Sequence, residues 1–381
     1  LNNNLYTKVI SIMERNNTVN IIGGGIAGLT TALALKTKGV NYNLFEQCPE
    51  ITYQDVALGI SANILHILKD WNILEETKQL GTEIYDFHLV DNKLKYIKSF
   101  KLPKPALSIH RKQFHKLLYS RLDAESIHLN SRKSIDDFSE NELIISADGI
   151  NSKIRQEIYP DLKLRDSNQI LFRGISEIVL DEKFKNAYHD FVGENLRFAI
   201  IHMGANRYAW YIIKEKRSFE KLPLDKTVLK SYFKNYHPIV LQVIDSSESI
   251  YPAELLDINP KKRKSLEWFS KNTLLIGDAI HPTTPNMANG ACLAMEDSYL
   301  LGGLLGNENL PLSQIFERFQ KRRTSKVDPV VFYSWWFGKI VHQDIKIIDD
   351  LVKVGMSLTP KFFFDKIYSN ILIETNIEKL S

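Results

Sequence analysis

The chain has 381 residues, of which 44% are hydrophobic and 25% are charged, and its formal net charge is +4. This length exceeds what one hydrophobic core usually serves, so we expect two domains in an ordinary globular protein. The charge is spread along the chain, and the one basic run, at 261–264, is expected to be a solvated loop. This distribution argues against a nucleic-acid-binding protein.

No apolar stretch approaches the roughly 20 residues that a membrane-spanning helix needs. The two cysteines, Cys48 and Cys292, give no disulfide framework, which is typical of a reducing compartment. We therefore expect a cytoplasmic protein that is a monomer or a weak dimer. Residues 1–18 are polar and rich in asparagine, which predicts a flexible leader and fits a natural start at Met13.

The first strong pattern lies between Val19 and Glu46. The apolar stretch VNIIGGG predicts a strand, IAGLTTALALKTK predicts a helix that ends near Gly39, and NYNLFEQ predicts a second strand. Gly23, Gly25 and Gly28 have the GxGxxG spacing between strand and helix, which permits a tight turn and a close approach of pyrophosphate to the backbone. The terminal acid Glu46 is placed to bind a ribose hydroxyl, so the sequence predicts a site for FAD or NAD.

Two helices and a strand are predicted next, before a series of alternating strands begins. Residues 61–80 and 112–122 have helical spacing, and LIISADG at 143–149 predicts another buried strand. Alternating stretches such as LRFAIIHM and RYAWYIIK fill 165–255 and predict a sheet-rich domain. After LLIGDA the chain is predicted to be mainly helical, and the aromatic stretches SWWFG and KFFF are expected to be core or interface.

These elements predict an α/β fold in which a Rossmann-like dinucleotide-binding domain carries a sheet-rich insert and a C-terminal helical tail. The family resemblance that follows implies that the first is an FAD-binding domain of the GR2 type and that the insert is a substrate domain. We assign 19–70, 106–165 and 272–325 to the FAD-binding domain. We assign 71–105 and 166–271 to the substrate domain and 326–381 to the C-terminal helices.

Several stretches, in order, resemble the single-component FAD-dependent aromatic hydroxylases, a family that includes salicylate hydroxylase, urate hydroxylase and zeaxanthin epoxidase. The resemblance runs from about residue 19 to about 370. The stretches that carry it are GGGIAGLTTALALKTKGV with FEQ, LGISANILHILKDWNIL, LSIHRKQFHKLL, ISADGINSKIR, LFRGI and IGDAIHPTTPNMANGACLAMEDS. Together they are specific, although each alone is modest.

The resemblance implies FAD as the bound cofactor and NAD(P)H as a transient electron donor. It implies that Asp278 accepts a hydrogen bond from the ribityl chain and that the helix starting near Gly290 points at the flavin ring, where its dipole would stabilise reduced flavin. The full set of cofactor-binding residues that we expect is Gly23, Gly25, Ala27, Gly28, Glu46, Gln47, Arg111, Asp148, Asp278, Pro285, Ala288, Asn289, Gly290 and Ala291. This chain has Ala288-Asn289-Gly290 where the family usually has Gly-Gln-Gly.

The family's activity implies a monooxygenase that uses NAD(P)H and O₂ to hydroxylate a small aromatic or other electron-rich substrate through a flavin C4a-hydroperoxide. A tetracycline-modifying monooxygenase or another flavin oxidoreductase on the same scaffold remains an alternative, as does a flavin-binding redox sensor without turnover. A halogenase is disfavoured because the chain has no WxWxIP segment.

Candidate substrate residues come from the sheet-rich insert and the proline-rich loop. They are Arg197, His202, Tyr211, Pro285, Asn286 and Met287, and the first three are also the candidate catalytic residues. His281 is expected to make a structural hydrogen bond. No metal site is expected, because the chain has no HExxH segment or cysteine pair.

Overall fold

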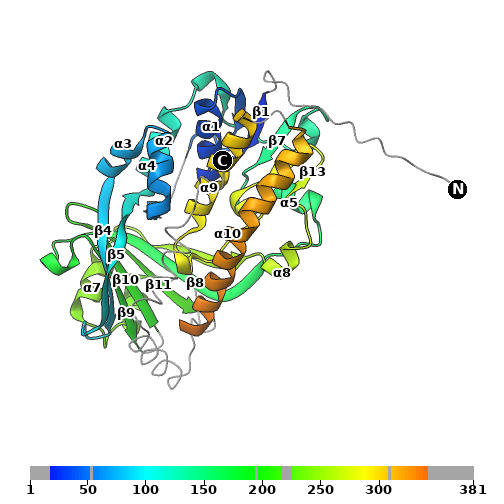
Figure 1. The fold of residues 1–381 in the computed structure, drawn as a ribbon. Helices are drawn as coiled ribbons and strands as arrows, with labels where there is room; N and C mark the ends of the chain where they lie inside the picture. Colours follow the sequence, from blue (N-terminus) through cyan, green and yellow to red (C-terminus); the bar gives the residue numbers. More distant parts are fainter. Residues whose placement is uncertain (1–17, 52–54, 194–195, 217–224, 308–309, 342–381) are drawn as a thin grey trace.

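The structure is a computed structural model that describes residues 18–51, 55–193, 196–216, 225–307 and 310–341. It contains two sheets, with helices packed around the first and a long final helix that runs from the first sheet towards the second (Figure 1). The predicted fold class is confirmed: a Rossmann-like domain carries a sheet-rich insert, and a helix follows at the C-terminal side.

The first sheet has six strands in the order β13-β14-β7-β1-β2-β6. Pairing is parallel from β14 to β6, and only β13 is antiparallel to its neighbour. The strands are β1 (Val19–Ile22), β2 (Tyr42–Phe45), β6 (Ile127–His128), β7 (Leu143–Ser146), β13 (Phe269–Ser270) and β14 (Thr273–Leu275). Three distant stretches of the chain therefore build one sheet around β1.

The predicted strand–helix–strand opening is confirmed, because α1 (Ile26–Thr37) connects β1 to β2. A second helix, α9 (Gly290–Asn307), packs on α1 from the far end of the chain. The Ser298 hydroxyl lies 2.8 Å from that of Thr30 and 2.9 Å from that of Thr31. The two helices that begin nearest to the expected cofactor are thus joined side by side.

The second sheet has eight strands in the order β12-β8-β11-β10-β9-β4-β5-β3. The strands are β3 (Ala57–Ile60), β4 (Gly81–Asp91), β5 (Tyr96–His110), β8 (Arg165–Glu177), β9 (Ala187–Gly193), β10 (Leu196–His202), β11 (Arg207–Glu215) and β12 (Tyr251–Asp257). One face carries a buried core that includes Phe198 and Trp210 and packs against α6 (Lys226–Tyr232) and α7 (Pro238–Asp245). We call the opposite face, which carries Arg197 and Tyr211, the inner face.

The remaining helices are short, except for the last one. They are α2 (Leu65–Asp70), α3 (Leu74–Gln79), α4 (Arg111–Ser120), α5 (Lys153–Ile158), α8 (Pro260–Arg263) and α10 (Leu312–Val341). The helical stretch predicted at 61–80 is interrupted at Asn72, whose φ of 57° is left-handed. The second predicted helix, at 112–122, corresponds to α4.

The arrangement of β3 and of α10 bears on the domain limits expected from the sequence. Strand β3 pairs with β5 in the eight-stranded sheet, although we had assigned its residues to the FAD-binding domain. Helix α10 crosses the expected boundary at residue 326 without a break. The leader at 1–17 and the segment with KFFF lie outside the described residues.

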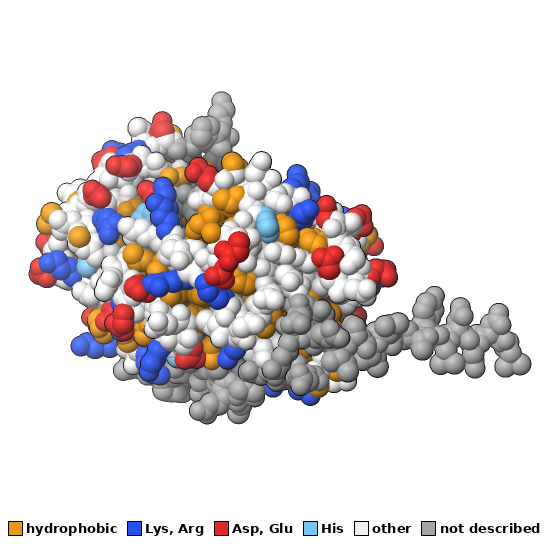
Figure 2. Space-filling model, turned by 90° about the horizontal axis from the view of Figure 1, so that it is seen from above, with side chains coloured by type: hydrophobic (Ala, Val, Ile, Leu, Met, Phe, Trp, Pro, Cys, Tyr) orange, Lys and Arg blue, Asp and Glu red, His pale blue; other side chains and the backbone are white. Residues whose placement is uncertain are grey.

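The basic run at 261–264 is not simply a solvated loop. Its first three residues lie in α8, and Arg263 is 1% exposed because it pairs with Asp328 of α10. Elsewhere acidic and basic side chains are interspersed over the face shown in Figure 2. Among the described residues, no helix has the length and apolar character needed to cross a bilayer.

Candidate functional site

The glycine-rich loop forms a tight turn at the carboxyl end of β1. Gly23 has φ 110°, and a Cβ atom there would lie 2.4 Å from the Ala147 carbonyl oxygen. A Cβ atom at Gly28 would lie 1.8 Å from the Gly23 carbonyl oxygen, so the helix can approach the turn only without a side chain. No atom lies within 4 Å of the position that a Cβ atom of Gly25 would occupy. The loop therefore leaves open space in front of the start of α1, as a bound pyrophosphate requires.

Glu46 lies at the end of β2, beside this loop. Its two carboxylate oxygens accept hydrogen bonds from the Gly24 amide at 2.6 Å and the Cys48 amide at 2.9 Å. Both bonds come from backbone, so they fix the carboxylate without neutralising its charge. The following residue, Gln47, is exposed. The loop and the acid thus lie together, as the sequence predicts for the adenosine end of FAD.

Asp278 lies in a second loop that comes close to the same helix start. Its loop reaches α1, because a Cβ atom at Gly277 would lie 3.1 Å from that of Ala27. The Asp278 side chain is accessible to solvent, yet protein surrounds it so closely that burial raises the pKa of its carboxyl. An accessible carboxylate with arginines nearby can accept a hydrogen bond from a ligand hydroxyl, as the family resemblance implies for the ribityl chain of FAD.

Two arginines lie close enough to Asp278 to affect its carboxyl. Arg155 is buried, and its guanidinium donates to the carbonyl oxygens of Ala279 at 2.9 Å and Ile150 at 2.6 Å. Together with Arg111 at the start of α4, it opposes the effect of burial on the pKa of Asp278. The two arginines therefore make the surroundings of Asp278 favourable for an anionic group.

Asp148 has a local role that the sequence did not indicate. It accepts hydrogen bonds from the Ser146 hydroxyl at 2.6 Å and from the Lys153 amide at 2.8 Å, and so it caps the start of α5. It also lies next to the glycine turn, because a Cβ atom at Gly23 would lie 3.1 Å from its Cα atom.

The proline-rich loop leads from Asp278 into α9. Asn286 and Asn289 are buried, whereas Pro285, Met287 and Ala291 are half-buried and Ala288 is exposed. Ala288 has φ 48°, a left-handed conformation that a side chain disfavours. A glycine, which the family usually has at this position, would adopt the same left-handed conformation with less steric strain. The helix nevertheless begins at Gly290.

A buried cluster of charges holds this loop against α9 and α10. The Asp297 carboxylate accepts from the Gly277 amide at 2.8 Å, from His281 Nε2 at 2.6 Å and from Arg323 Nε at 2.6 Å. Arg323 also donates to Glu296 at 2.8 Å. All four side chains are 1% exposed or less. His281 therefore has the structural role that the sequence predicts.

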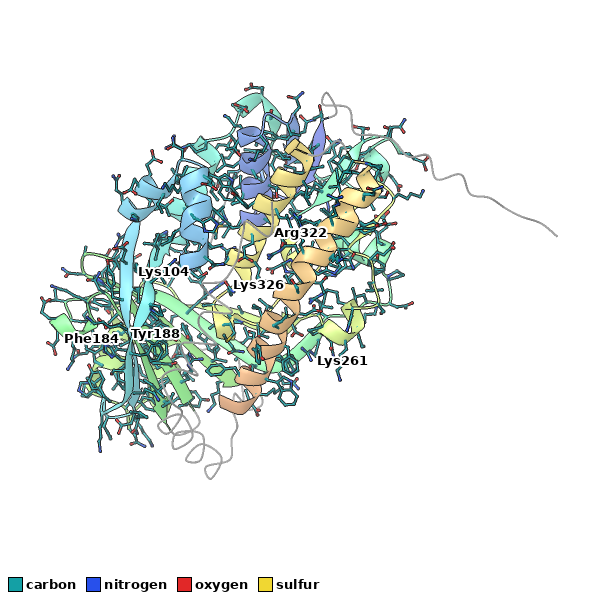
Figure 3. All side chains as sticks on the ribbon, in the orientation of Figure 1. Lys104, Phe184, Tyr188, Lys261, Arg322 and Lys326 are labelled. Carbon is teal, nitrogen blue, oxygen red and sulfur yellow. The ribbon has the colours of Figure 1, made fainter. Side chains whose placement is uncertain are left out.

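The inner face of the eight-stranded sheet carries a second polar cluster. Arg197 Nε lies 2.7 Å from each carboxylate oxygen of Asp190, and Arg197 Nη2 donates to the Tyr188 hydroxyl at 3.1 Å. The Tyr188 hydroxyl is also hydrogen-bonded to that of Tyr211. Arg197 of β10 and Tyr211 of β11 are thus brought together as expected, and both contact Tyr188 of β9. Tyr188 is labelled in Figure 3.

His202 does not lie with these residues. It lies five residues beyond Arg197 in β10, so its side chain points to the opposite face of the sheet. There its Nδ1 accepts from the Asn186 amide at 3.0 Å and its Nε2 lies 3.2 Å from the Ala205 carbonyl oxygen. The structure therefore corrects our expectation that His202 belongs to the substrate site.

Helix α10 connects the proline-rich loop to the polar cluster of the inner face, a contact that the sequence did not predict. The Phe337 ring lies 5.3 Å from the Arg197 guanidinium carbon. One residue later, the Gly338 carbonyl oxygen accepts a hydrogen bond from Gln169 of β8 at 2.9 Å. The Asn286 amide donates to the Ser334 carbonyl oxygen at 3.0 Å. The helix thus contacts both the proline-rich loop and the inner face.

Replacement of Gly338 by alanine is expected to destabilise the protein by about 1–2 kcal/mol. Its Cβ atom would lie 2.3 Å from Asn286 Nδ2, so the buried amide must give up its hydrogen bonds. This loss exceeds the gain of about 1 kcal/mol in helix propensity. Denaturant unfolding measures the change. Gly303→Ala in α9 is the control, because no atom lies within 4 Å of its Cβ position, and equal behaviour of the two variants would contradict this account.

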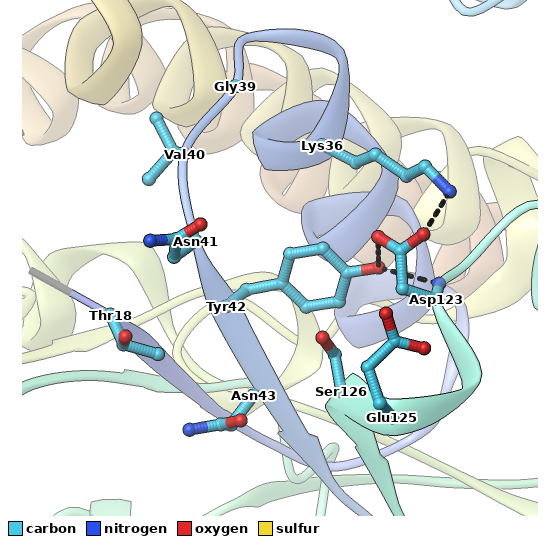
Figure 4. Close-up of a pocket in the computed structure, with 10 residues that line it drawn as sticks. All are labelled: Thr18, Lys36, Gly39, Val40, Asn41, Tyr42, Asn43, Asp123, Glu125 and Ser126. Atoms are coloured by element: carbon cyan, nitrogen blue, oxygen red, sulfur yellow. Dashed lines mark hydrogen bonds and ion pairs between the residues drawn. The ribbon is translucent and has the colours of Figure 1, made fainter. Parts of the chain in front are cut away.

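One cavity of about 430 Å³ lies away from these residues (Figure 4). It is lined by Tyr42, Lys36 and Asp123, which are joined by hydrogen bonds and an ion pair. Burial raises the pKa of Tyr42 to about 12. The cavity lies at the start of β2, whereas ligands of such sheets bind beyond the carboxyl ends of the strands. We therefore do not assign it to the active site.

A second cavity, of about 400 Å³, lies where the two domains meet on the inner face. Asp55 and His110, which form an ion pair, line one side of it, and Ile175 and Tyr251 line the other. Three carboxylates and one arginine contribute to its lining, so it is unfavourable for the phosphates of a nicotinamide donor.

Comparisons with known proteins agree with this geometry. A family model described as FAD binding domain matches residues 16–141 and 130–309. The 3-hydroxybenzoate 6-hydroxylase of Polaromonas naphthalenivorans is 27% identical over 91% of this chain and 94% of its own length. The 2-heptyl-3-hydroxy-4(1H)-quinolone synthase of Pseudomonas aeruginosa is 23% identical over 85% of this chain and 89% of its own length. HpxO of Klebsiella pneumoniae, solved with FAD and uric acid, has a TM-score of 0.83 at 20% identity over 95% of this chain and 98% of its own.

Proposed function

The chain belongs to the FAD-binding-domain family of flavin-dependent monooxygenases, and from this we propose that it hydroxylates a small aromatic substrate held between the proline-rich loop and the inner face. The enzyme uses FAD, with NAD(P)H as the electron donor and O₂ as the oxidant. Bound FAD supplies the redox chemistry and the activation of oxygen, and the protein supplies binding, orientation and the exclusion of water.

The glycine-rich loop and the Asp278 loop would hold the two ends of FAD. The open space at Gly25 would accommodate the pyrophosphate at the start of α1, and Glu46 beside it would accept a hydrogen bond from a ribose hydroxyl. Asp278 would accept a hydrogen bond from a hydroxyl of the ribityl chain. The contact between Gly277 and Ala27 supports this assignment, because it brings the two loops to one helix start.

The start of α9 and the two arginines would stabilise negative charge on the reduced cofactor. Gly290 is the first residue of this 18-residue helix, so its first backbone N–H groups have no partner within the helix and form the positive end of its dipole. Arg111 and Arg155 add positive charge near Asp278. A preorganised set of donors of this kind stabilises developing charge without reorganisation.

One observation supports the position of the substrate more than any other. Consecutive residues of α10 contact the inner face and the proline-rich loop: Phe337 lies over Arg197, and Gly338 lies against Asn286. A molecule bound beside Phe337 would lie between the flavin loop and the sheet. Arg197 and Tyr211 would then orient it, as substrate-contacting residues.

The relatives do not agree on one substrate. One is named for a hydroxybenzoate, which carries a carboxylate, and another for a quinolone with a heptyl chain. We propose an aromatic or similarly electron-rich compound as the substrate class. We also place the enzyme in the cytoplasm as a monomer or weak dimer, a proposal that rests on its cysteine content and composition.

The activity is tested by a screen of aromatic compounds with the FAD-loaded protein. We expect slow oxidation of NAD(P)H alone and clear stimulation by the right compound, whose product gains one oxygen atom. Oxygen uptake, hydrogen peroxide release and product mass are measured together. A redox sensor would show no turnover with any compound, and an oxidase would release all oxygen as hydrogen peroxide; either result would overturn the proposal.

A further inference from the structure

We propose that the substrate is an uncharged aromatic compound with an apolar extension, because Asp190 neutralises Arg197 and a row of aromatic rings leads away from the pair. This inference rests on the proposed function, since it assumes that the inner face binds the substrate. It assigns a specificity-determining role to Asp190, which acts on the ligand through Arg197, and to Phe87.

The charge of Arg197 is already matched within the protein. Its guanidinium makes three close contacts with the Asp190 carboxylate, two at 2.7 Å and one at 2.5 Å. The side chains of Arg197 and Asp190 are 5% and 3% exposed, so water screens the pair little. A ligand carboxylate would meet the negative charge of Asp190 together with the positive charge of Arg197, and would lose its hydration without net attraction.

The hydroxyl groups beside this pair are also neutral. Burial raises the pKa of Tyr211 and raises that of Tyr188 well above its ordinary value. Both side chains are nevertheless partly accessible, so they can exchange hydrogen bonds with a ligand. A phenolic hydroxyl or a ring carbonyl would find a partner here and bring no charge.

Another arginine of the inner face, Arg173, lies towards the expected flavin end. Arg173 lies beside Tyr211 in the sheet, and burial together with the nearby charge of Arg111 lowers its pKa to about 10. Arg111 in turn acts on Asp278. The arginines Arg111 and Arg173 therefore place positive charge near the expected position of the reduced flavin. The Arg197–Asp190 pair, in contrast, leaves the substrate end without net charge.

An aromatic row extends from this neutral end across the sheet. We define it as Phe100, Phe87, Tyr188 and Tyr211. The Phe87 ring is stacked on those of Phe100 and Tyr188, with centroids 4.9 Å and 4.7 Å apart. The Tyr188 and Tyr211 rings lie 6.4 Å apart.

All four rings of the aromatic row are half-buried, although stacked rings of this size are commonly covered in a core. The separations between neighbouring centroids limit the row to at most about 16 Å between the centres of its two end rings, Phe100 and Tyr211. A small ring that fills the site beside Arg197 would leave most of the row uncovered. An apolar chain attached to that ring would cover it, which is why we infer an extended substrate.

Binding to the FAD-loaded protein tests the inference, with the flavin absorption spectrum as the readout. The probes are 4-alkylphenols with chains of one to eight carbons, and 3- and 4-hydroxybenzoate. We expect the affinity of the alkylphenols to rise by up to about fourfold for each methylene that becomes buried. We expect both hydroxybenzoates to bind at least about tenfold more weakly than 4-methylphenol. Tighter binding of a hydroxybenzoate than of 4-methylphenol would overturn the proposal.

Two variants test the charge of the Arg197–Asp190 pair and the aromatic row separately. Asp190→Asn leaves the charge of Arg197 unmatched and should improve hydroxybenzoate binding relative to 4-methylphenol by about tenfold or more. Asp257→Asn is the matched control, because it breaks another arginine–aspartate pair in the same sheet. There Arg165 donates to the buried Asp257 at 2.6 Å and 2.8 Å. An equal change of preference in both variants would contradict a local charge effect.

Phe87→Ala should remove the dependence of affinity on chain length and leave the binding of 4-methylphenol within about twofold. Phe332→Ala on the outer side of α10, where the ring is 48% exposed, is the control and should keep the chain-length dependence. Persistence of that dependence in Phe87→Ala would exclude the aromatic row. If Asp190→Asn does not fold, the probe series on the wild-type protein still decides the charge preference. These measurements do not need turnover, so failure of the hydroxylase activity is distinguishable from failure of this inference.

Discussion

Alanine in place of Gly28 is expected to lower FAD affinity by at least about 100-fold, equivalent to about 2.7 kcal/mol. The new Cβ atom would lie 1.8 Å from the Gly23 carbonyl oxygen, which belongs to the backbone of the turn and cannot rotate away. Either α1 moves back from the turn or the turn opens, and both changes remove the space in which the pyrophosphate is expected to bind. Flavin absorbance of the desalted protein measures the loss.

The control for Gly28→Ala is the variant Gly303→Ala, which should keep its full FAD content. A circular dichroism spectrum shows whether each variant is folded. Gly25→Ala adds a second test, because its Cβ atom has open space in the protein itself; it should fold normally and still lose FAD. Retention of FAD in both Gly25→Ala and Gly28→Ala would show that the cofactor does not lie against this loop.

Substitution of Arg323 by methionine is expected to reduce the free energy of unfolding by about 3–5 kcal/mol. Arg323 is the cation of the buried cluster, and its removal leaves Asp297 and Glu296 without the charge that balances them. His281 alone contacts only Asp297 within the described part of this cluster. The pKa of Asp297, which its cationic partners keep below its ordinary value against the effect of burial, should rise.

Denaturant unfolding compares Arg323→Met with Arg318→Met, an exposed arginine of the same helix whose loss should cost no more than about 0.5 kcal/mol. Arg323→Lys keeps the charge but loses the planar arrangement of donors, so it should fall between the two. A loss below about 1 kcal/mol for Arg323→Met would mean that the carboxylates are not ionised in the folded protein.

The cofactor side of the molecule could be predicted from the sequence because its signals are local. The spacing of Gly23, Gly25 and Gly28 lies within one strand–helix junction, and Glu46 ends the next strand. The resemblance to a known family supplied Asp278, since an isolated Gly-Asp pair alone predicts no more than a turn. The structure then brings these segments together through the contact between α1 and α9.

The substrate side could not be predicted to the same extent, because it depends on strand register and distant packing. Asp190 matches Arg197 only because β9 and β10 pair with Asp190 opposite Ala199, which sets the two charged side chains on one face. The error at His202 was avoidable: an odd separation from Arg197 within one strand predicts opposite faces. No local pattern indicates that Phe337 lies over Arg197, because β11, β12, the proline-rich loop and α9 lie between the two residues in the sequence.

The central place of β1 in the six-stranded sheet has a consequence for how the enzyme is made. Its neighbour β7 ends at Ser146, and the residues of α10 that complete the site extend to Gly338. A ribosome that adds 5–20 residues per second needs roughly 15–60 s to pass from the glycine turn to the end of that helix. For most of that interval the nascent chain carries the pyrophosphate loop without Asp278 and α9, and α10 is completed only at its end. We therefore expect the chain to bind FAD only after α10 has been synthesised. The supply of FAD should then determine what fraction of the completed chains becomes active enzyme. It should not affect the rate of synthesis.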